Sequence, residues 1–171
     1  MILGVISDTH GNLPLMQDAA DALTRQHGAE LILHLGDDYS DALALRDAGF
    51  PVRMVPGLWC PEYRNPRVPN LIVATFDGVT IAFCHADQDL RGPARQAAII
   101  AMGHTHTAEI RRVGRTVFFN PGHLKAAVHR GRPASYGLIQ IGADRVTLRI
   151  YGLDGRPRLE EDFLKSNLGA P

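Results

Sequence analysis

The chain has 171 residues, of which 18 are basic and 18 are acidic, so its formal net charge at pH 7 is zero. That balance gives no electrostatic argument for nucleic acid or an anionic membrane as the main partner. Its 45% hydrophobic and 21% charged residues are ordinary for a globular protein, and the length predicts a single domain over residues 1–171 with a sizeable core.

The first third of the chain alternates short apolar runs with segments of helical periodicity. We predict strands at the β-branched runs and helices where apolar residues recur every three to four positions. The expected elements are a strand at Ile2–Ser7, a helix from Leu13 to about Gln26, a strand at Leu31–Leu35, a helix at Asp41–Ala48 and a strand at Val52–Val55. This alternation predicts parallel strands joined by right-handed crossovers.

A long proline-rich loop is expected at Pro56–Pro69, and after it turn signals separate short apolar runs. Asp77-Gly78 and Gly114-Arg115 fit the turns of β-hairpins. We therefore expect a mainly antiparallel or mixed sheet from Leu71–Phe76, Val79–Cys84, Ala97–Ala101, Ile110–Val113, Thr116–Phe119, Ser135–Ile141 and Arg145–Tyr151. The residues after Leu164 are expected to fray.

Targeting signals are not visible in the sequence. No apolar run approaches the ~18 residues of a membrane span, and the apolar run Ile2–Ile6 is too short for a signal peptide. The two cysteines, Cys60 and Cys84, form no disulfide framework, which fits a reducing compartment. We predict a cytoplasmic protein without a membrane partner, in which Cys84 is a buried core thiol.

Carboxylate and imidazole side chains follow two of the predicted strands. Asp8 and His10 come directly after the first strand, and residues i and i+2 of an extended backbone face the same way. Asp37 follows the second strand through Gly36, and its two oxygens suit it to bridge two cations. Ligands of open α/β sheets gather at the carboxyl ends of strands. Asn12 can cap the helix that follows.

Three histidines extend this set. His85 ends a predicted strand, and His104 and His106 again stand two residues apart. The pattern predicts one metal site from Asp8, His10, Asp37 and His106, and a second from Asp37, His85 and His104. These ligand types suit Mn, Fe, Zn or Ni. Paired metal sites of this kind carry out in-line displacement at phosphorus.

The order of these motifs resembles that of the calcineurin-like metallophosphoesterases, in particular their small single-domain bacterial and archaeal phosphodiesterase branch. The matching stretches are Ser7-Asp8-Thr9-His10-Gly11-Asn12, His34-Leu35-Gly36-Asp37, Gly103-His104-Thr105-His106 and Asn120-Pro121-Gly122. The resemblance implies an α/β fold, a two-sheet αββα sandwich. It also implies two divalent metal ions, with Mn favoured and Fe, Ni or Zn as alternatives. The implied chemistry is hydrolysis of phosphodiesters or phosphomonoesters by a metal-bridging hydroxide, with the same six residues as ligands.

One motif departs from the family. Leu58 stands where the family carries an Asn ligand of the second metal, and Trp59 and Cys60 replace the next polar positions. Three outcomes are open: a looser second site, substitution by Cys60 or Glu62, or an empty second site in an inactive protein. We favour weakened binding with retained activity, because Asp37, His85 and His104 remain. Smaller departures are Ala86 for Gly and His123 for Ser.

The sequence therefore predicts a metal-dependent phosphoesterase that acts on a small phosphoester substrate. The alternative is a catalytically inactive binding or scaffold protein on the same fold, as in the retromer scaffold subunit, and the missing Asn supports it. A nucleic-acid-processing enzyme is disfavoured by the neutral charge. The physiological substrate and the choice between monoesters and diesters are not readable from the sequence.

Several other residues keep two interpretations. His123 fits a proton donor to the leaving group or, more simply, a loop histidine, whereas His27 and His129 resemble surface residues. His34 could orient a metal ligand. Trp59 could stack on a substrate base or pack its loop, and the arginines within 111–112 and 130–132 are solvated loop charges or a phosphate-attracting rim. The apolar strand Thr116–Phe119 suits the core or the edge of a homo-oligomer.

Overall fold

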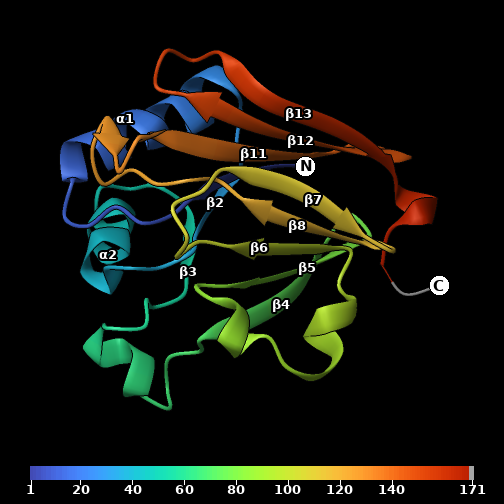
Figure 1. Cartoon of the computed structure of the whole chain (residues 1–171), viewed down its shortest axis with the longest axis horizontal. Helices are drawn as coiled ribbons and strands as arrows, with labels where there is room; N and C mark the ends of the chain where they lie inside the picture. Colours follow the sequence, from blue (N-terminus) through green and yellow to red (C-terminus); the bar gives the residue numbers. More distant parts are fainter. Residues whose placement is uncertain (170–171) are drawn as a thin grey trace.

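A computed structural model describes residues 1–169 of the chain. Two β-sheets pack face to face, and two α-helices cover the outer face of the first sheet (Figure 1). A small two-stranded ribbon stands apart from both sheets. The expected two-sheet sandwich is confirmed. No helix within residues 1–169 combines the length and the apolar character needed to cross a membrane.

The first sheet has six strands in the order β13-β12-β11-β1-β2-β3. Their bounds are Ile2–Ile6 for β1, Leu31–His34 for β2, Val52–Met54 for β3, Ser135–Ile141 for β11, Arg145–Gly152 for β12 and Pro157–Leu164 for β13. The first three strands are parallel, as predicted, and β11 to β13 add an antiparallel half beside β1. The sheet is therefore mixed.

The second sheet has five strands in the order β4-β5-β6-β8-β7. Their bounds are Leu71–Phe76 for β4, Val79–Cys84 for β5, Ile99–Met102 for β6, Glu109–Val113 for β7 and Thr116–Asn120 for β8. Both predicted hairpins are present, and β5, β6 and β8 run parallel between them. The strand β8 lies between β6 and β7, and its residues Val117 and Phe119 are buried. This strand is therefore part of the core and does not form an exposed edge.

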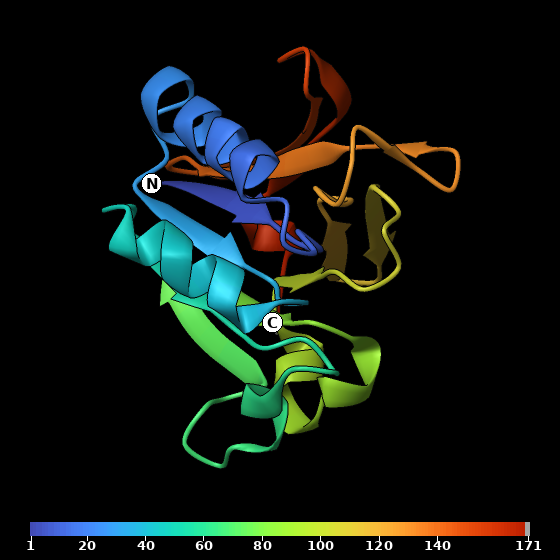
Figure 2. The ribbon, with the colours of Figure 1, turned by 90° about the vertical axis from the view of Figure 1, so that its left-hand side faces the viewer.

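The helices α1 (Leu13–Asp21) and α2 (Tyr39–Asp47) lie on the outer face of the six-stranded sheet, which Figure 2 presents to the viewer. The helix α1 continues through one wider turn, Ala22–Gln26, to Gly28, which has a positive φ of 71°. The Asn12 side chain accepts the backbone N–H of Leu15 and so caps α1, as predicted. Apolar residues such as Met16, Ala20 and Leu23 pack on Ile6 and Ile32 of the sheet.

The main core fills the space between the two sheets, with residues such as Leu33, Phe83 and Phe119 fully or almost fully buried. The outer face of the five-stranded sheet is covered by two 3₁₀ segments, Asp87–Asp89 and Gly92–Gln96, in place of an α-helix. Cys84 is completely buried beneath them, as the sequence indicates.

Three features differ from expectation. The edge strand β13 carries eight residues of which only Phe163 is buried, so it lacks the apolar pattern that marks a strand. The ribbon pairs β9 (Val128–His129) with β10 (Arg132–Pro133). The expected fraying after Leu164 is wrong for residues 165–169, because Lys165–Asn167 forms a 3₁₀ turn and Leu168 is only 7% exposed. Residues 170–171 lie outside the described part.

Candidate metal centre

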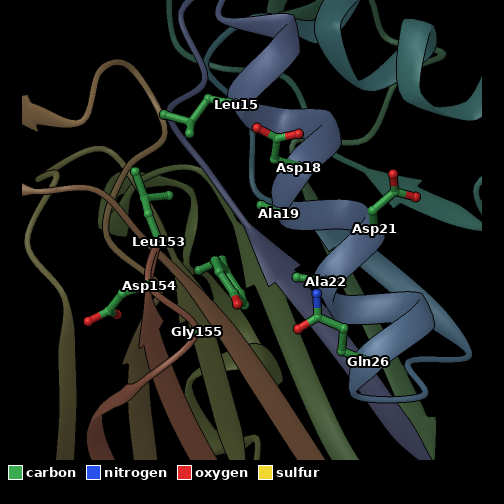
Figure 3. Close-up of a pocket in the computed structure, with 10 residues that line it drawn as sticks. Leu15, Asp18, Ala19, Asp21, Ala22, Gln26, Leu153, Asp154 and Gly155 are labelled. Atoms are coloured by element: carbon green, nitrogen blue, oxygen red, sulfur yellow. The ribbon is translucent and has the colours of Figure 1, made fainter.

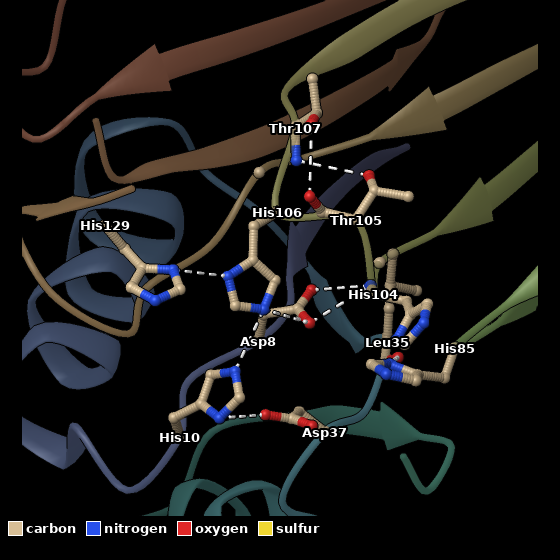
Figure 4. A network of polar contacts seen from close by, with 12 residues as sticks. Asp8, His10, Leu35, Asp37, His85, His104, Thr105, His106, Thr107 and His129 are labelled. Atoms are coloured by element: carbon tan, nitrogen blue, oxygen red, sulfur yellow. Dashed lines mark hydrogen bonds and ion pairs between the residues drawn. The ribbon is translucent and has the colours of Figure 1, made fainter. Parts of the chain in front are cut away.

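The six predicted ligands stand at the ends of four strands (Figure 4). Asp8 and His10 follow β1, Asp37 follows β2, His85 follows β5, and His104 and His106 follow β6. The strands β1 and β2 are parallel neighbours in one sheet, and β5 and β6 are parallel neighbours in the other. The carboxyl ends of both pairs therefore bring these side chains into one region.

A first candidate ligand group joins Asp8, His10 and His106, whose ligand atoms all lie within 4.8 Å of one another. The Nε2 atom of His106 is 3.2 Å from Oδ1 of Asp8 and 3.1 Å from Nε2 of His10. The buried Oδ2 atom of Asp37 is 2.6 Å from Nδ1 of His10 but lacks a partner with hydrogen-bond geometry within residues 1–169. A buried carboxylate oxygen this close to an imidazole nitrogen places two metal-ligand atoms where one cation could bind both.

A second group joins Asp8, Asp37 and His85 within the same 4.8 Å limit. The Nδ1 atom of His85 donates to the carbonyl of Leu35 at 2.9 Å, which leaves Nε2 free for an ion. The sequence assigned His104 to this site, and its ring lies beside that of His85 at 5.1 Å between centroids. His104 is exposed and belongs to none of the candidate ligand groups within residues 1–169, whereas Asp8 is in the group with Asp37 and His85, so the assignment of His104 stays a prediction.

The backbone at these ligands is left-handed. The φ angles are 54° at Asp8, 48° at His10, 88° at Asp37, 66° at His104 and 58° at His106. The expectation that each i, i+2 pair lies on extended backbone is therefore wrong. Among residues 1–169, these are five of the seven non-glycine positions with positive φ. Such conformations cost about 1–3 kcal/mol each and persist where the surrounding structure enforces them, commonly at functional sites.

Buried polar contacts enforce the loop that follows β1. The carboxylate of Asp8 accepts the backbone N–H of His104 at 3.0 and 3.2 Å. The buried Asp41 on α2 accepts the Thr9 hydroxyl at 2.6 Å and the Gly11 N–H at 2.8 Å. Sequence reasoning missed Asp41, because nothing in its helical position signals that it turns toward the loop.

Close approach of backbones adds a second constraint. A Cβ atom on Gly103 would lie 1.9 Å from Oγ of Ser7 and 2.6 Å from Oδ2 of Asp8, so only glycine fits there. Asn120 donates from Nδ2 to the carbonyl of Gly103 at 2.9 Å and to Oγ1 of Thr105 at 3.0 Å. The Asn120-Pro121-Gly122 motif thus holds the loop that carries His104 and His106.

The electrostatics of the region favour a cation. Burial by itself raises the pKa of Asp8, but the hydrogen bond from His106 and the charge of His85 outweigh it, so the pKa of Asp8 is lowered. Burial and the nearby negative charge of Asp8 raise the pKa of Asp37. Two carboxylates that share one site repel each other, and a metal ion between them would relieve that repulsion.

The loop that replaces the family's Asn motif reaches the same region without supplying a ligand. Leu58 is partly buried, and the Trp59 side chain is 87% exposed, so it does not pack the loop. The thiol of Cys60 donates to the carbonyl of Asp37 and accepts the Tyr39 N–H, and burial raises its pKa. Neither Cys60 nor Glu62 belongs to a ligand group within residues 1–169, so substitution by these side chains finds no support.

Other histidines surround the ligands. His129, expected at the surface, contacts His106 through Nδ1 atoms 3.1 Å apart, which the sequence did not signal (Figure 4). His123 is completely buried and its Nε2 contacts the carbonyl of Arg132 at 3.0 Å, which favours the structural interpretation over proton donation. His34 is buried, and its Nδ1 accepts the Gly36 N–H at 3.2 Å, beside the turn that carries Asp37. Asp38 also lies near the site, in a group with His10 and Asp37.

A pocket of about 520 Å³ lies away from the candidate ligands, between α1 and the turn after β12 (Figure 3). Asp18, Asp21 and Asp154 line it, and within residues 1–169 its lining includes no histidine and no cationic side chain. Its negative charge disfavours an anionic ligand. The combination of carboxylates and imidazoles, and not the volume, singles out the metal centre.

The fold and this site define a class, and comparison with known proteins agrees with it. The calcineurin-like phosphoesterase superfamily domain matches residues 1–144, and the chain belongs to this family. A probable metallophosphoesterase from Methanothermobacter thermautotrophicus is 30% identical over 137 residues, which cover 71% of this chain and 76% of the relative.

Solved structures share the fold. The phosphoesterase YfcE from E. coli superposes with a TM-score of 0.74 at 21% identity and covers 94% of this chain and 98% of its own. The Vps29 protein of Entamoeba histolytica, in complex with Zn²⁺, has a TM-score of 0.67 at 22% identity, with 96% and 99% covered. At these identities the likeness describes the fold alone.

Proposed function

We propose that this chain is a divalent-metal-dependent phosphoesterase that hydrolyses phosphodiester or phosphomonoester bonds. The observation that carries the proposal is the convergence of Asp8, His10 and His106 within 4.8 Å, with the buried Oδ2 atom of Asp37 only 2.6 Å from Nδ1 of His10. Membership of the phosphoesterase family supports it. Metal ions, when bound, lower the pKa of water and polarise phosphoryl oxygens.

The side chains themselves divide into two roles. Asp8, His10, Asp37, His85 and His106 would hold two ions through carboxylate and imidazole atoms, a ligand set that suits Mn, with Fe, Ni or Zn as alternatives. His104 donates its backbone N–H to Asp8, and because its ring lies 5.1 Å from that of His85 between centroids, it stays a proposed further ligand of the second ion. Because Leu58 offers no donor atom, we expect the second ion to bind more weakly than the first.

The test is hydrolysis of bis-p-nitrophenyl phosphate with added Mn²⁺ by the wild type and by Asp37→Ala. We expect turnover by the wild type that is lost on chelation. Asp37→Ala should lose more than the roughly 10–100-fold that removal of an outer-shell partner costs, because Asp37 is a direct ligand. Asp47→Ala, which removes an exposed carboxylate from α2, is the matched control and should keep full activity. Undiminished turnover by Asp37→Ala would refute the mechanism.

A binding protein on the same fold is the second candidate function. The exposed Trp59 beside a motif that has lost its ligand favours it, since an exposed aromatic side chain suits a contact surface. One experiment distinguishes the phosphoesterase from the binding protein. Mn²⁺-loaded protein without turnover of either bis-p-nitrophenyl phosphate or p-nitrophenyl phosphate would favour the binding protein.

A further inference from the structure

Three basic side chains line a pocket at the metal centre. Lys125, Arg130 and Arg132, together called the basic ridge below, enclose about 230 Å³ with His10, His104, Thr105, His106 and His129. The chain as a whole carries no net charge, so this concentration of positive charge is local. The pocket contains three of the predicted ligands, and therefore opens directly onto the candidate site.

The basic ridge is built into the fold. The two-residue turn of the β9–β10 ribbon has φ angles of 50° at Arg130 and 76° at Gly131, which match the left-handed turn of a tight hairpin. A non-glycine residue at such a position is uncommon, and here it places an arginine at the tip. The ribbon is fixed to the site by the contact of His129 with His106 at 3.1 Å.

Three further contacts orient the other two members, Arg132 and Lys125. Arg132 donates from Nη1 to the carbonyl of Thr105 at 3.1 Å, which anchors its guanidinium beside the loop of His104 and His106. The buried His123 contacts the carbonyl of the same arginine at 3.0 Å. The Asn12 side chain donates to the carbonyl of Lys125 at 3.0 Å and so holds this residue near the start of α1.

The basic ridge forms no direct ion pair within residues 1–169, although Lys125 is close enough to Asp37 and Asp38 for its charge to offset part of the rise that burial causes in their pKa values. The ion pairs found within residues 1–169 include none of its three members. Arg130 and Arg132 are exposed and Lys125 is half-buried, so their donors can reach a ligand in the pocket. The planar guanidinium group of arginine binds phosphate and carboxylate through paired, charge-assisted hydrogen bonds.

We propose that the basic ridge is a subsite for a second anionic group of the substrate, next to the phosphoester that is hydrolysed. This inference rests on the proposed function. It narrows the substrate class to small phosphoesters that carry another phosphate beyond the one attacked. A simple diester such as bis-p-nitrophenyl phosphate would leave the subsite empty.

The test uses two esters that differ by one phosphate: the p-nitrophenyl ester of thymidine 5′-phosphate, with and without a phosphate on the 3′ oxygen. Hydrolysis releases p-nitrophenol from both. We expect the wild type to have a higher kcat/KM for the ester with the second phosphate. Arg130→Asn should lower that preference about 10-fold, because a hydrogen bond to a charged group is lost. Asparagine tolerates the left-handed turn, so this variant keeps the ribbon.

Arg25→Ala, which removes an exposed arginine from the wider turn Ala22–Gln26 that follows α1, is the matched control and should keep the wild-type preference. No preference in the wild type, or equal loss with both esters in Arg130→Asn, would overturn the proposal. The same comparison is made with oligonucleotides. If the basic ridge raises kcat/KM only for long oligonucleotides and not for the doubly phosphorylated ester, the proposal is overturned in favour of a groove that binds nucleic acid.

Failure of the proposed function can be told apart from failure of this inference. Calorimetry on metal-free protein measures binding of thymidine 3′,5′-bisphosphate without any turnover. Tighter binding to the wild type than to Arg130→Asn would support the subsite even if no ester is hydrolysed. Equal binding to both proteins would overturn it even if hydrolysis is observed.

Discussion

Gly57 is the position where a single methyl group should disturb both the fold and the metal centre. A Cβ atom there would lie 2.3 Å from the carbonyl oxygen of Asp37, 2.4 Å from its Cα and 2.7 Å from its carbonyl carbon. All three are backbone atoms, so no rotation of a side chain relieves the overlap. Gly57→Ala must therefore displace the turn that carries Asp37.

The magnitude follows from the cost of overpacking, which is typically about 1–3 kcal/mol for an inserted methylene and lies at the upper end where backbone must move. In a chain of this size each kcal/mol lowers Tm by roughly 2–4 °C. We expect Gly57→Ala to lower Tm by roughly 6–12 °C. Gly142→Ala is the control, because its nearest atom lies at 3.4 Å and its φ is not positive, so it should shift Tm by less than about 3 °C.

The assay is thermal unfolding of metal-free protein followed by circular dichroism, with Mn²⁺ affinity measured in parallel by calorimetry. The displaced Asp37 should weaken Mn²⁺ binding in Gly57→Ala and leave it intact in Gly142→Ala. If Gly57→Ala unfolds within about 2 °C of the wild type, the backbone contact is not the constraint we infer.

Two further predictions concern a buried histidine and the replaced ligand. Burial lowers the pKa of His34 to about 4, so the unfolded state takes up a proton first as the pH falls, and stability should decrease by about 2 kcal/mol between pH 7 and 4.5. His34→Asn keeps an acceptor for Gly36 and should remove that part of the pH dependence in urea unfolding; an unchanged dependence would contradict the assignment. Leu58→Asn should tighten the weaker Mn²⁺ site in a calorimetric titration, and identical titrations for both proteins would count against a weakened second site.

The sequence predicted the sheets and the ligand region for a physical reason. The strands β1, β2, β5 and β6 are buried, and their hydrophobic pattern is visible without any partner. Their carboxyl ends then place Asp8, Asp37 and His85 together, whatever the loops do. The edge strand β13 was not predicted, because it is held by pairing with β12 and buries only Phe163, so its sequence lacks an apolar pattern.

The finer arrangement of the site could not be predicted, because it depends on contacts between segments far apart in sequence. His129 reaches His106 only because the β9–β10 ribbon folds back over the loop after β6. The left-handed backbone at Asp8 and His10 likewise results from bonds to Asp41 and His104, which a period-2 pattern does not encode. The ligands therefore lie at the strand ends where the sequence pattern predicts them, although their own backbone is left-handed and not extended.

The loop at Leu58 separates two roles that one sequence motif combines. Its positioning role persists, since Gly57 packs against the backbone of Asp37 and the thiol of Cys60 donates to the Asp37 carbonyl. Its ligand role is lost with the Asn side chain. Leu58→Asn should therefore restore a donor atom without rebuilding the loop, and its effect should appear in metal affinity rather than in Tm. A Leu58→Asn protein in which Tm of the metal-free form and Mn²⁺ affinity change together would show that the two roles are not separable.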